Sequence, residues 1–139
     1  MSGNNALGDA TYGKSLKITV EAGSAVSAGD ALAIDQGATQ DGKKPIVDAT
    51  ASGTAAVDQF AGVACEDIAS GAEGTMLVHG AVIASVDTGV SAGASLTAST
   101  TAGQLADGAD GPAVALSDEG GTDSTGTTLN ANEAEVYVR

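Results

Sequence analysis

The chain has 139 residues, the size of one domain, and carries 18 acidic and 5 basic residues for a net charge of −13. Because clustered Lys and Arg are needed to neutralise phosphates, this balance argues against a nucleic-acid partner. No segment approaches the roughly 20 apolar residues of a membrane helix, and no basic region followed by an apolar core marks a secretory signal. We therefore expect a protein made in a cytoplasm, with neither nucleic-acid nor membrane partners.

Large apolar residues are scarce. Alanine supplies 28 of the hydrophobic residues, whereas Leu, Ile, Val and Phe together number 26. Such a thin core predicts a domain that gains stability from neighbouring subunits. The net charge is self-repulsive in dilute buffer but screened in molar salt, where the Debye length is about 3 Å. The acidic excess favours a protein adapted to high salt and surrounded by non-specific cations; an ordinary acidic surface is the alternative.

Residues 1–14 are mostly small and polar, rich in glycine, and without periodicity. They predict an extended N-terminal arm with Tyr12 as its one large anchor. Such an arm either docks on a partner or is a frayed terminus. The remaining residues, 15–139, are expected to form a single β domain.

Alternation of apolar and polar residues begins at Leu16 and runs beyond Val20, which predicts a half-buried strand. A second short strand is expected at residues 31–35. An edge strand is expected at residues 45–49, because Pro45 is tolerated at the start of an edge strand.

One phrase occurs twice in the chain. Residues 26–32 read VSAGDAL, and residues 90–96, at an offset of 64, read VSAGASL. Gly29 and Gly93 fall where a tight turn needs a positive φ. The repetition predicts a strand–turn–strand unit used twice, within a partly self-similar β architecture. Nothing in the phrase performs chemistry, which favours a scaffold or binding module.

The longest strand-like stretch covers residues 75–86, and Gly80 is expected to mark a bulge or bend within it. Apolar residues occupy both faces, so the strand is either buried on both sides or presents one face to another subunit. The candidate subunit-interface residues on that face are Leu77, His79, Ala81 and Ile83.

The last third of the chain predicts a short buried strand at residues 113–116 and a long, exposed acidic loop at residues 117–132. The terminal strand, residues 133–139, is expected to point Val136 inward and Glu135 outward. No helix of three turns is found. The fold class we predict is all-β: a small β-barrel or sandwich of short strands with an extended N-terminal arm and long acidic loops.

Residues able to perform chemistry are few. His79 is the single histidine and Cys65 the single cysteine, which makes a poor zinc site and no catalytic triad. The acidic segments at residues 107–111 and 118–123 do not match the spaced calcium loop, so a solvated acidic face is favoured. We therefore expect no enzyme, no catalytic residue, no metal and no cofactor.

Several short phrases follow one another in a familiar order: VSAGDAL at 26–32, FAGVA at 60–64, VHGAV at 78–82, VSAG at 90–93 and VYV at 136–138. In order and spacing, over residues 15–139, the chain resembles the small head-decoration, or capsid-cement, proteins of tailed phages. Together with the acidic composition, it looks like such a protein from a virus of a halophilic archaeon.

The resemblance implies a virion protein made in the host cytoplasm. It implies homotrimers that bind the major capsid protein on the outer capsid surface and stabilise the lattice without enzymatic activity. It further implies that the N-terminal arm clamps the capsid protein. The candidate capsid-contact residues of the arm are Asn4, Asn5, Leu7, Tyr12 and Lys14.

A binding module for carbohydrate or a receptor, on a virion or cell surface, is the alternative. It would need an exposed aromatic platform, and the aromatic residues present are Tyr12, Phe60 and Tyr137. So small a set makes a poor platform.

Overall fold

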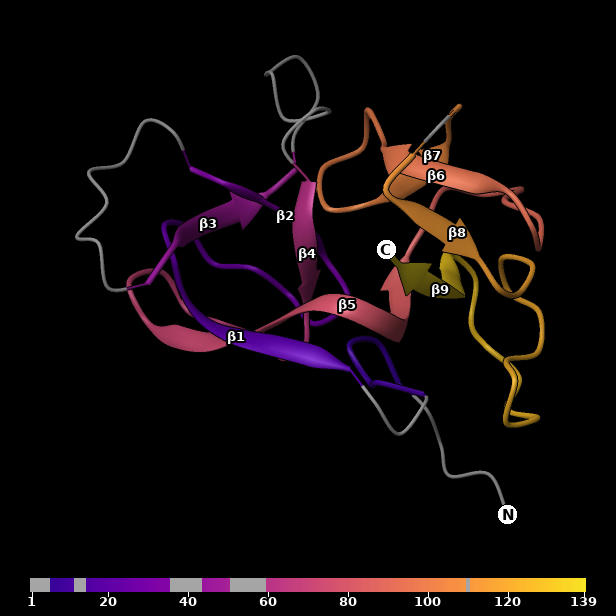
Figure 1. Cartoon of the computed structure of the whole chain (residues 1–139), viewed down its shortest axis with the longest axis horizontal. Helices are drawn as coiled ribbons and strands as arrows, with labels where there is room; N and C mark the ends of the chain where they lie inside the picture. Colours follow the sequence, from indigo (N-terminus) through magenta and orange to yellow (C-terminus); the bar gives the residue numbers. More distant parts are fainter. Residues whose placement is uncertain (1–5, 12–14, 36–43, 51–59, 110) are drawn as a thin grey trace.

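The structure is a computed structural model, and it describes residues 6–11, 15–35, 44–50, 60–109 and 111–139. These residues form strands and turns, with no helix among them, so the predicted all-β class is confirmed (Figure 1). The strands are β1 (Leu16–Ala22), β2 (Ala31–Ile34), β3 (Ile46–Ala49), β4 (Phe60–Ala64), β5 (Glu73–Ser85), β6 (Ser95–Ala98), β7 (Leu105–Asp107), β8 (Ala113–Ala115) and β9 (Glu133–Val138).

The first half of the chain closes into a five-stranded barrel. The strands pair in the order β1-β3-β2-β4-β5, and an antiparallel pairing between β1 and β5 closes the circuit. All neighbours are antiparallel except β1 and β3, which run parallel. The barrel interior holds the fully buried Val20, Leu32 and Val47, with Met76 beside them. Alternating apolar residues on short strands therefore suffice for a core.

A second unit of the same connectivity follows. The second half of β5 pairs with β9, and β8, β6 and β7 continue the sheet. A parallel bridge between Val86 and Leu105 joins the end of this circuit to its beginning. It repeats the parallel pair Ala22–Val47 of the first unit. The partly self-similar architecture expected from the repeated phrase is confirmed.

Strand β5 belongs to both units. Its first half, up to His79, pairs with β1, and its second half, from Gly80 onward, pairs with β9. Gly80 has a φ of 125° at this change of partner, which a residue with a side chain rarely adopts. The bend expected at this glycine thus marks the junction between the two units.

The two copies of the repeated phrase make matching backbone hydrogen bonds. The N–H of Gly29 donates to Ala64 at 2.8 Å, and the N–H of Gly93 donates to Ala115 at 2.7 Å. The two glycines have φ values of 85° and 89°. Each turn is therefore fastened to the end of the strand beside it, β4 in the first unit and β8 in the second.

A carboxylate fastens each turn as well. The N–H of Ala28 donates to Oδ1 of Asp67 at 2.9 Å, and the N–H of Ala92 donates to Oδ1 of Asp118 at 2.8 Å. Hydrogen bonds to a charged acceptor are stronger than those between neutral groups. The duplication therefore extends from the backbone to the side chains that hold it.

One expectation for the strands is wrong. Residues 45–49 were expected to form an edge strand, but β3 lies between β1 and β2 and pairs with both. Pro45 precedes β3, where its missing N–H costs no pairing, and its carbonyl accepts the N–H of Glu21 at 2.9 Å.

The two turn glycines give a matched test of the repeat. A Cβ at Gly93 would meet no atom within 4 Å, whereas a Cβ at Gly29 would lie 2.6 Å from Cδ2 of Leu7. We expect Gly93→Ala to lower the free energy of unfolding by about 1–2 kcal/mol through backbone strain alone. Gly29→Ala should cost more, as measured by urea denaturation.

The control is the double variant Gly29→Ala with Leu7→Ala. It should lose less stability than the sum of its single variants, because the contacts with Cδ2 and Cγ of Leu7 are removed and only the contact with its Cβ, at 2.8 Å, remains. Equal losses for the two glycine variants would contradict the packing of the arm on the first turn.

Candidate interaction surface

Part of the N-terminal arm pairs with the edge of β5 through an isolated bridge between Ala10 and Val82. The N–H of Gly8 donates to the carbonyl of Ile83 at 2.7 Å, and the N–H of Ile83 donates to the carbonyl of Asp9 at 3.0 Å. The N–H of Thr11 donates to the carbonyl of Ala81 at 3.2 Å, and an antiparallel bridge accompanies these bonds. The arm thus lies against its own chain over residues 6–11.

Close packing holds the arm in this place. Gly8 has a φ of 83°, and a Cβ there would lie 2.7 Å from the carbonyl oxygen of Cys65. Leu7 lies against Gly29 and is half-buried. Of the expected capsid-contact residues, Leu7 therefore packs on its own chain. The others, Asn4, Asn5, Tyr12 and Lys14, lie outside the described residues.

The expected subunit face of β5 is covered within one chain. Leu77 and Ile83 are 0% exposed and Ala81 is 1% exposed, so these side chains have no surface with which to contact a second copy. Only His79 of the four candidates is exposed. Burial on both sides, the other possibility left open by the apolar pattern, is what the structure shows. The trimer itself stays a prediction.

The acidic loop at residues 117–132 supplies part of that cover. Glu135, expected to point outward, is 0% exposed and lies opposite Ile83 on the neighbouring strand. Its carboxylate accepts hydrogen bonds from the N–H and Oγ of Ser124, at 2.9 and 2.8 Å. The N–H of Glu135 donates to Oγ of Ser117 at 3.0 Å. The loop is therefore tied to β9 through Ser117 and Ser124 rather than fully exposed, and Figure 1 shows it running beside and below β9.

The carboxylates of this loop accept hydrogen bonds from the backbone. Oδ1 of Asp123 accepts from the N–H groups of Thr125 and Thr127, at 2.9 and 3.0 Å. The two carboxylate oxygens of Glu119 accept from Gly89 and Asn132, at 3.2 and 2.8 Å. Sequence reasoning missed this role, although acidic residues beside glycine, serine and threonine signal such turns.

Two aspartates are held in surroundings that oppose their charge. Burial raises the pKa of Asp30, the N–H of Ser27 lowers it, and the nearby charge of Asp67 raises it. Burial likewise raises the pKa of Asp48, and a hydrogen bond with Asp35 adds to the rise. By contrast, the N–H groups of its two backbone donors lower the pKa of Glu119.

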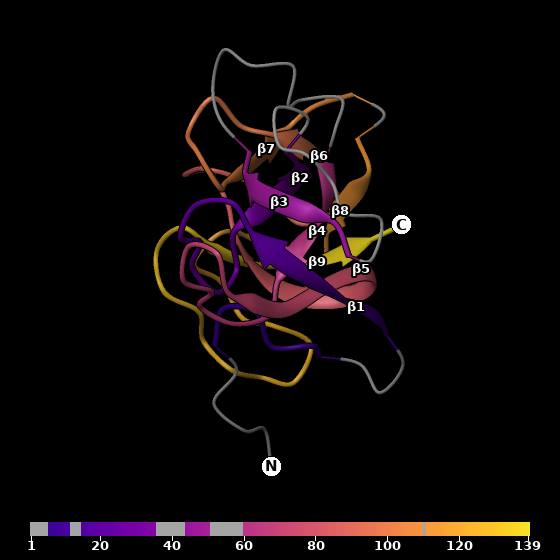
Figure 2. The same ribbon diagram turned by 90° about the vertical axis from the view of Figure 1, so that its left-hand side faces the viewer.

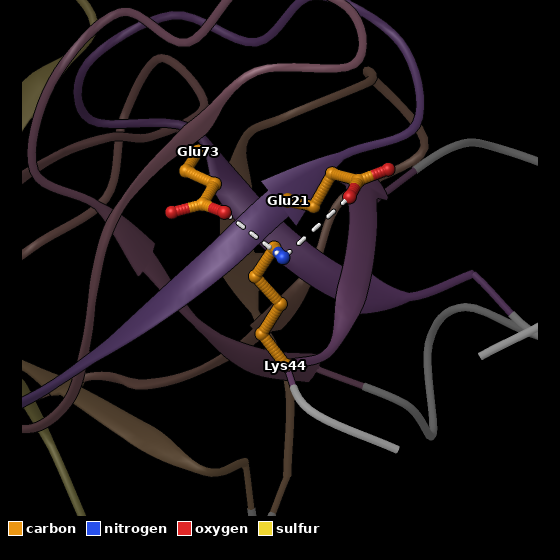
Figure 3. A network of polar contacts seen from close by, with 3 residues as sticks. All are labelled: Glu21, Lys44 and Glu73. Carbon is orange, nitrogen blue, oxygen red and sulfur yellow. Dashed lines mark ion pairs between the residues drawn. The ribbon is translucent and has the colours of Figure 1, made fainter. Parts of the chain in front are cut away.

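Lys44 joins the ends of three strands (Figure 3). Its Nζ lies 2.9 Å from Oε2 of Glu73 and 4.0 Å from Oε1 of Glu21, and these two glutamates are paired across β1 and β5. The ammonium group offsets the repulsion between them. Glu73 is 61% exposed, so solvent screens the interaction and its contribution to stability is small.

The remaining candidate groups form no catalytic arrangement in the described part of the chain. The rings of His79 and Tyr137 meet edge to face at 5.5 Å, with Oη of the tyrosine 3.3 Å from Nε2 of the histidine. Cys65 is half-buried, and burial raises the pKa of its thiol. Phe60 packs against the core, which leaves Tyr137 alone of the expected aromatic platform within the described residues.

Among the residues that the structure describes, no group of three or more His, Cys, Asp or Glu side chains is placed to hold a metal ion. Nor does that part of the chain contain a helix long and apolar enough to span a membrane.

Comparison with known proteins adds a structural likeness. No family model and no curated protein matches the sequence. The fold resembles that of a phage head fibre base. The solved structure is the N base of head fibre gp8.5 in bacteriophage phi29, with a TM-score of 0.56 over 91% of this chain and 95% of that chain. The two sequences are 15% identical, so the likeness concerns the fold.

The opposite pKa shifts of Glu119 and Asp30 predict opposite pH effects. Glu119→Gln places an amide NH2 group against a backbone N–H and should lower the free energy of unfolding at pH 7. The carboxylate stabilises the fold above its unfolded pKa of about 4.3, and this stabilisation is lost as the pH falls through its lower folded pKa. The variant should therefore approach the wild type in acid, as measured by urea denaturation at successive pH values.

Asp30→Asn is the matched control, because it keeps an oxygen acceptor for Ser27 and removes a buried charge. It should raise the free energy of unfolding at pH 7. This gain should fade as the pH falls through the raised folded pKa toward the unfolded value of about 3.9. Ala94 occupies the equivalent position in the second unit, where the same turn forms without a carboxylate. If the free energies of unfolding of both variants differed from the wild type with the same sign and the same pH dependence, the opposite pKa shifts of Glu119 and Asp30 would be contradicted.

Proposed function

We propose that this chain is a structural protein of a virion head, which binds the outside of the capsid lattice as a trimer and stabilises it. The observation that carries the proposal is the likeness to a phage head fibre base over nearly the full length of both chains. The order of sequence phrases independently resembles head-decoration proteins. Neither the described carboxylates nor the His79–Tyr137 pair is arranged for catalysis, which fits a structural role.

The physical basis is mass action. A protein that binds the closed shell and not the separated subunits shifts the equilibrium toward the shell. Many weak, repeated contacts add to a strong total when one particle holds many copies. The partner we propose is the major capsid protein. The net charge of −13 favours basic groups on the surface that this chain meets.

The likeness to a fibre base also favours a second candidate, a virion-surface binding module for carbohydrate or a receptor. Quantitative mass spectrometry of purified virions separates the two. We expect a near-equimolar ratio of this chain to the major capsid protein. A few copies per particle would favour the receptor or carbohydrate module, and complete absence from virions would remove both.

The halophilic origin inferred from composition remains part of the proposal. Carboxylates that repel one another should make the fold more stable as salt screens them, with most of the gain below about 1 M, where the Debye length reaches 3 Å. We expect the thermal unfolding midpoint to rise from low salt to molar KCl. An unchanged midpoint would favour an ordinary acidic protein.

A further inference from the structure

The internal repeat identifies equivalent strand edges in the two units. At the offset of 64 that relates the repeated phrases, Lys17 of β1 corresponds to Ala81 of β5, and Thr19 corresponds to Ile83. The strand pairings follow the same correspondence. Lys17 lies opposite Leu77 in the β1–β5 pair, and Ala81 lies opposite Tyr137 in the β5–β9 pair. In the second unit the arm covers this edge, because its backbone forms hydrogen bonds with the backbone of Ala81 and Ile83.

In the first unit no segment within the described ranges covers the same edge. The N–H of Glu21 donates to Pro45, on the side of β1 away from β5, whereas the N–H of Ala22 donates to Ala72 on the β5 side. Since backbone groups alternate along a strand, those of Lys17 and Thr19 point the same way as Glu21. No residue in the described ranges bonds to them, and both side chains are exposed.

The chain around this edge is accessible too. Leu16 is 57% exposed, an unusual value for a large apolar side chain in this protein. Figure 2 shows β1 on the side of the molecule that faces the viewer. An uncovered row of N–H and C=O groups is a template for an added strand, and a lysine such as Lys17 is a common guard against indiscriminate pairing.

We propose that this edge of β1 receives an extended segment of the capsid shell as an added strand, an inference that rests on the proposed function. The arm shows what fits the equivalent edge: a short segment centred on Ala10 that pairs antiparallel with Val82 through backbone hydrogen bonds. A second copy of this chain is a poor occupant. The arm it would donate has to leave its own β5, which uncovers an equal edge and gains nothing. Strand addition of this kind draws its affinity from main-chain hydrogen bonds.

The test compares two substitutions at one position. Thr19→Pro removes the outward N–H, and proline is tolerated on an edge strand whose N–H is unpaired. Thr19→Val keeps the N–H and the branched side chain that suits a strand. We expect the wild type and Thr19→Val to bind purified capsids equally. Thr19→Pro should bind at least roughly tenfold more weakly, the equivalent of one hydrogen bond of about 1.4 kcal/mol.

Hydrogen exchange of the wild type, free and bound to capsids, keeps the test independent of whether Thr19→Pro folds. Within residues 16–22, the N–H groups of Lys17 and Thr19 should become protected on binding, whereas the N–H of Glu21, already bonded to Pro45, should change little. If the wild type binds but this segment stays unprotected, the inference fails while the proposed function stands. Protection of residues 16–22 by self-association, without capsids, would assign the edge to a second copy and also overturn it. If the wild type does not bind capsids, the proposed function fails, and the inference fails with it.

Discussion

Thirteen consecutive residues, Glu73–Ser85, supply a strand to each of two five-stranded units, and the other strands are arranged around them. This sharing imposes the composition of β5. Its second half is covered on both faces, so Ala81 and Val82 are both buried although they point in opposite directions. Small and β-branched side chains fit between two layers in this way. The glycine at the junction lets one strand change partners without a break in the chain.

Many of the acidic side chains hold the fold together through hydrogen bonds. More than half of the 18 acidic residues accept hydrogen bonds from backbone N–H groups through their carboxylates, which compensates for a core with few large side chains. The residues concerned are Asp9, Asp30, Asp48, Glu66, Asp67, Asp118, Glu119, Asp123, Glu133 and Glu135. Each bond ties a loop or strand end to a fixed point, at the cost of mutual repulsion among the carboxylates.

Sequence patterns predicted the strands and the duplication, because alternation and turn glycines are local signals. They failed where the burial of a residue depends on a segment distant in sequence. The apolar face containing Ile83 was visible, but not that Glu135, held by Ser124 of the loop at residues 117–132, would be buried opposite Ile83, nor that the arm would pair with the edge of this strand. Alternation along the last strand predicted that Glu135 points outward to solvent. The side chain is instead buried, because Ser124, eleven residues away, bonds its carboxylate. The edge at Thr19 became visible only when the two units were compared, since an open edge is a property of the pairing.

The duplication has a consequence for how the chain reaches its structure. Most strand pairs join residues far apart in sequence, which slows folding. Since β1 and the second half of β5 are equivalent, β9 has two similar strands with which to pair during folding. Wrong pairing between similar units is a typical misfolding route of repeat proteins. The two copies differ in sequence, for example in the charged Lys17 of β1 and the small Ala81 of β5. Such differences favour the pairing of β9 with β5 over its pairing with β1, and so reduce misfolding.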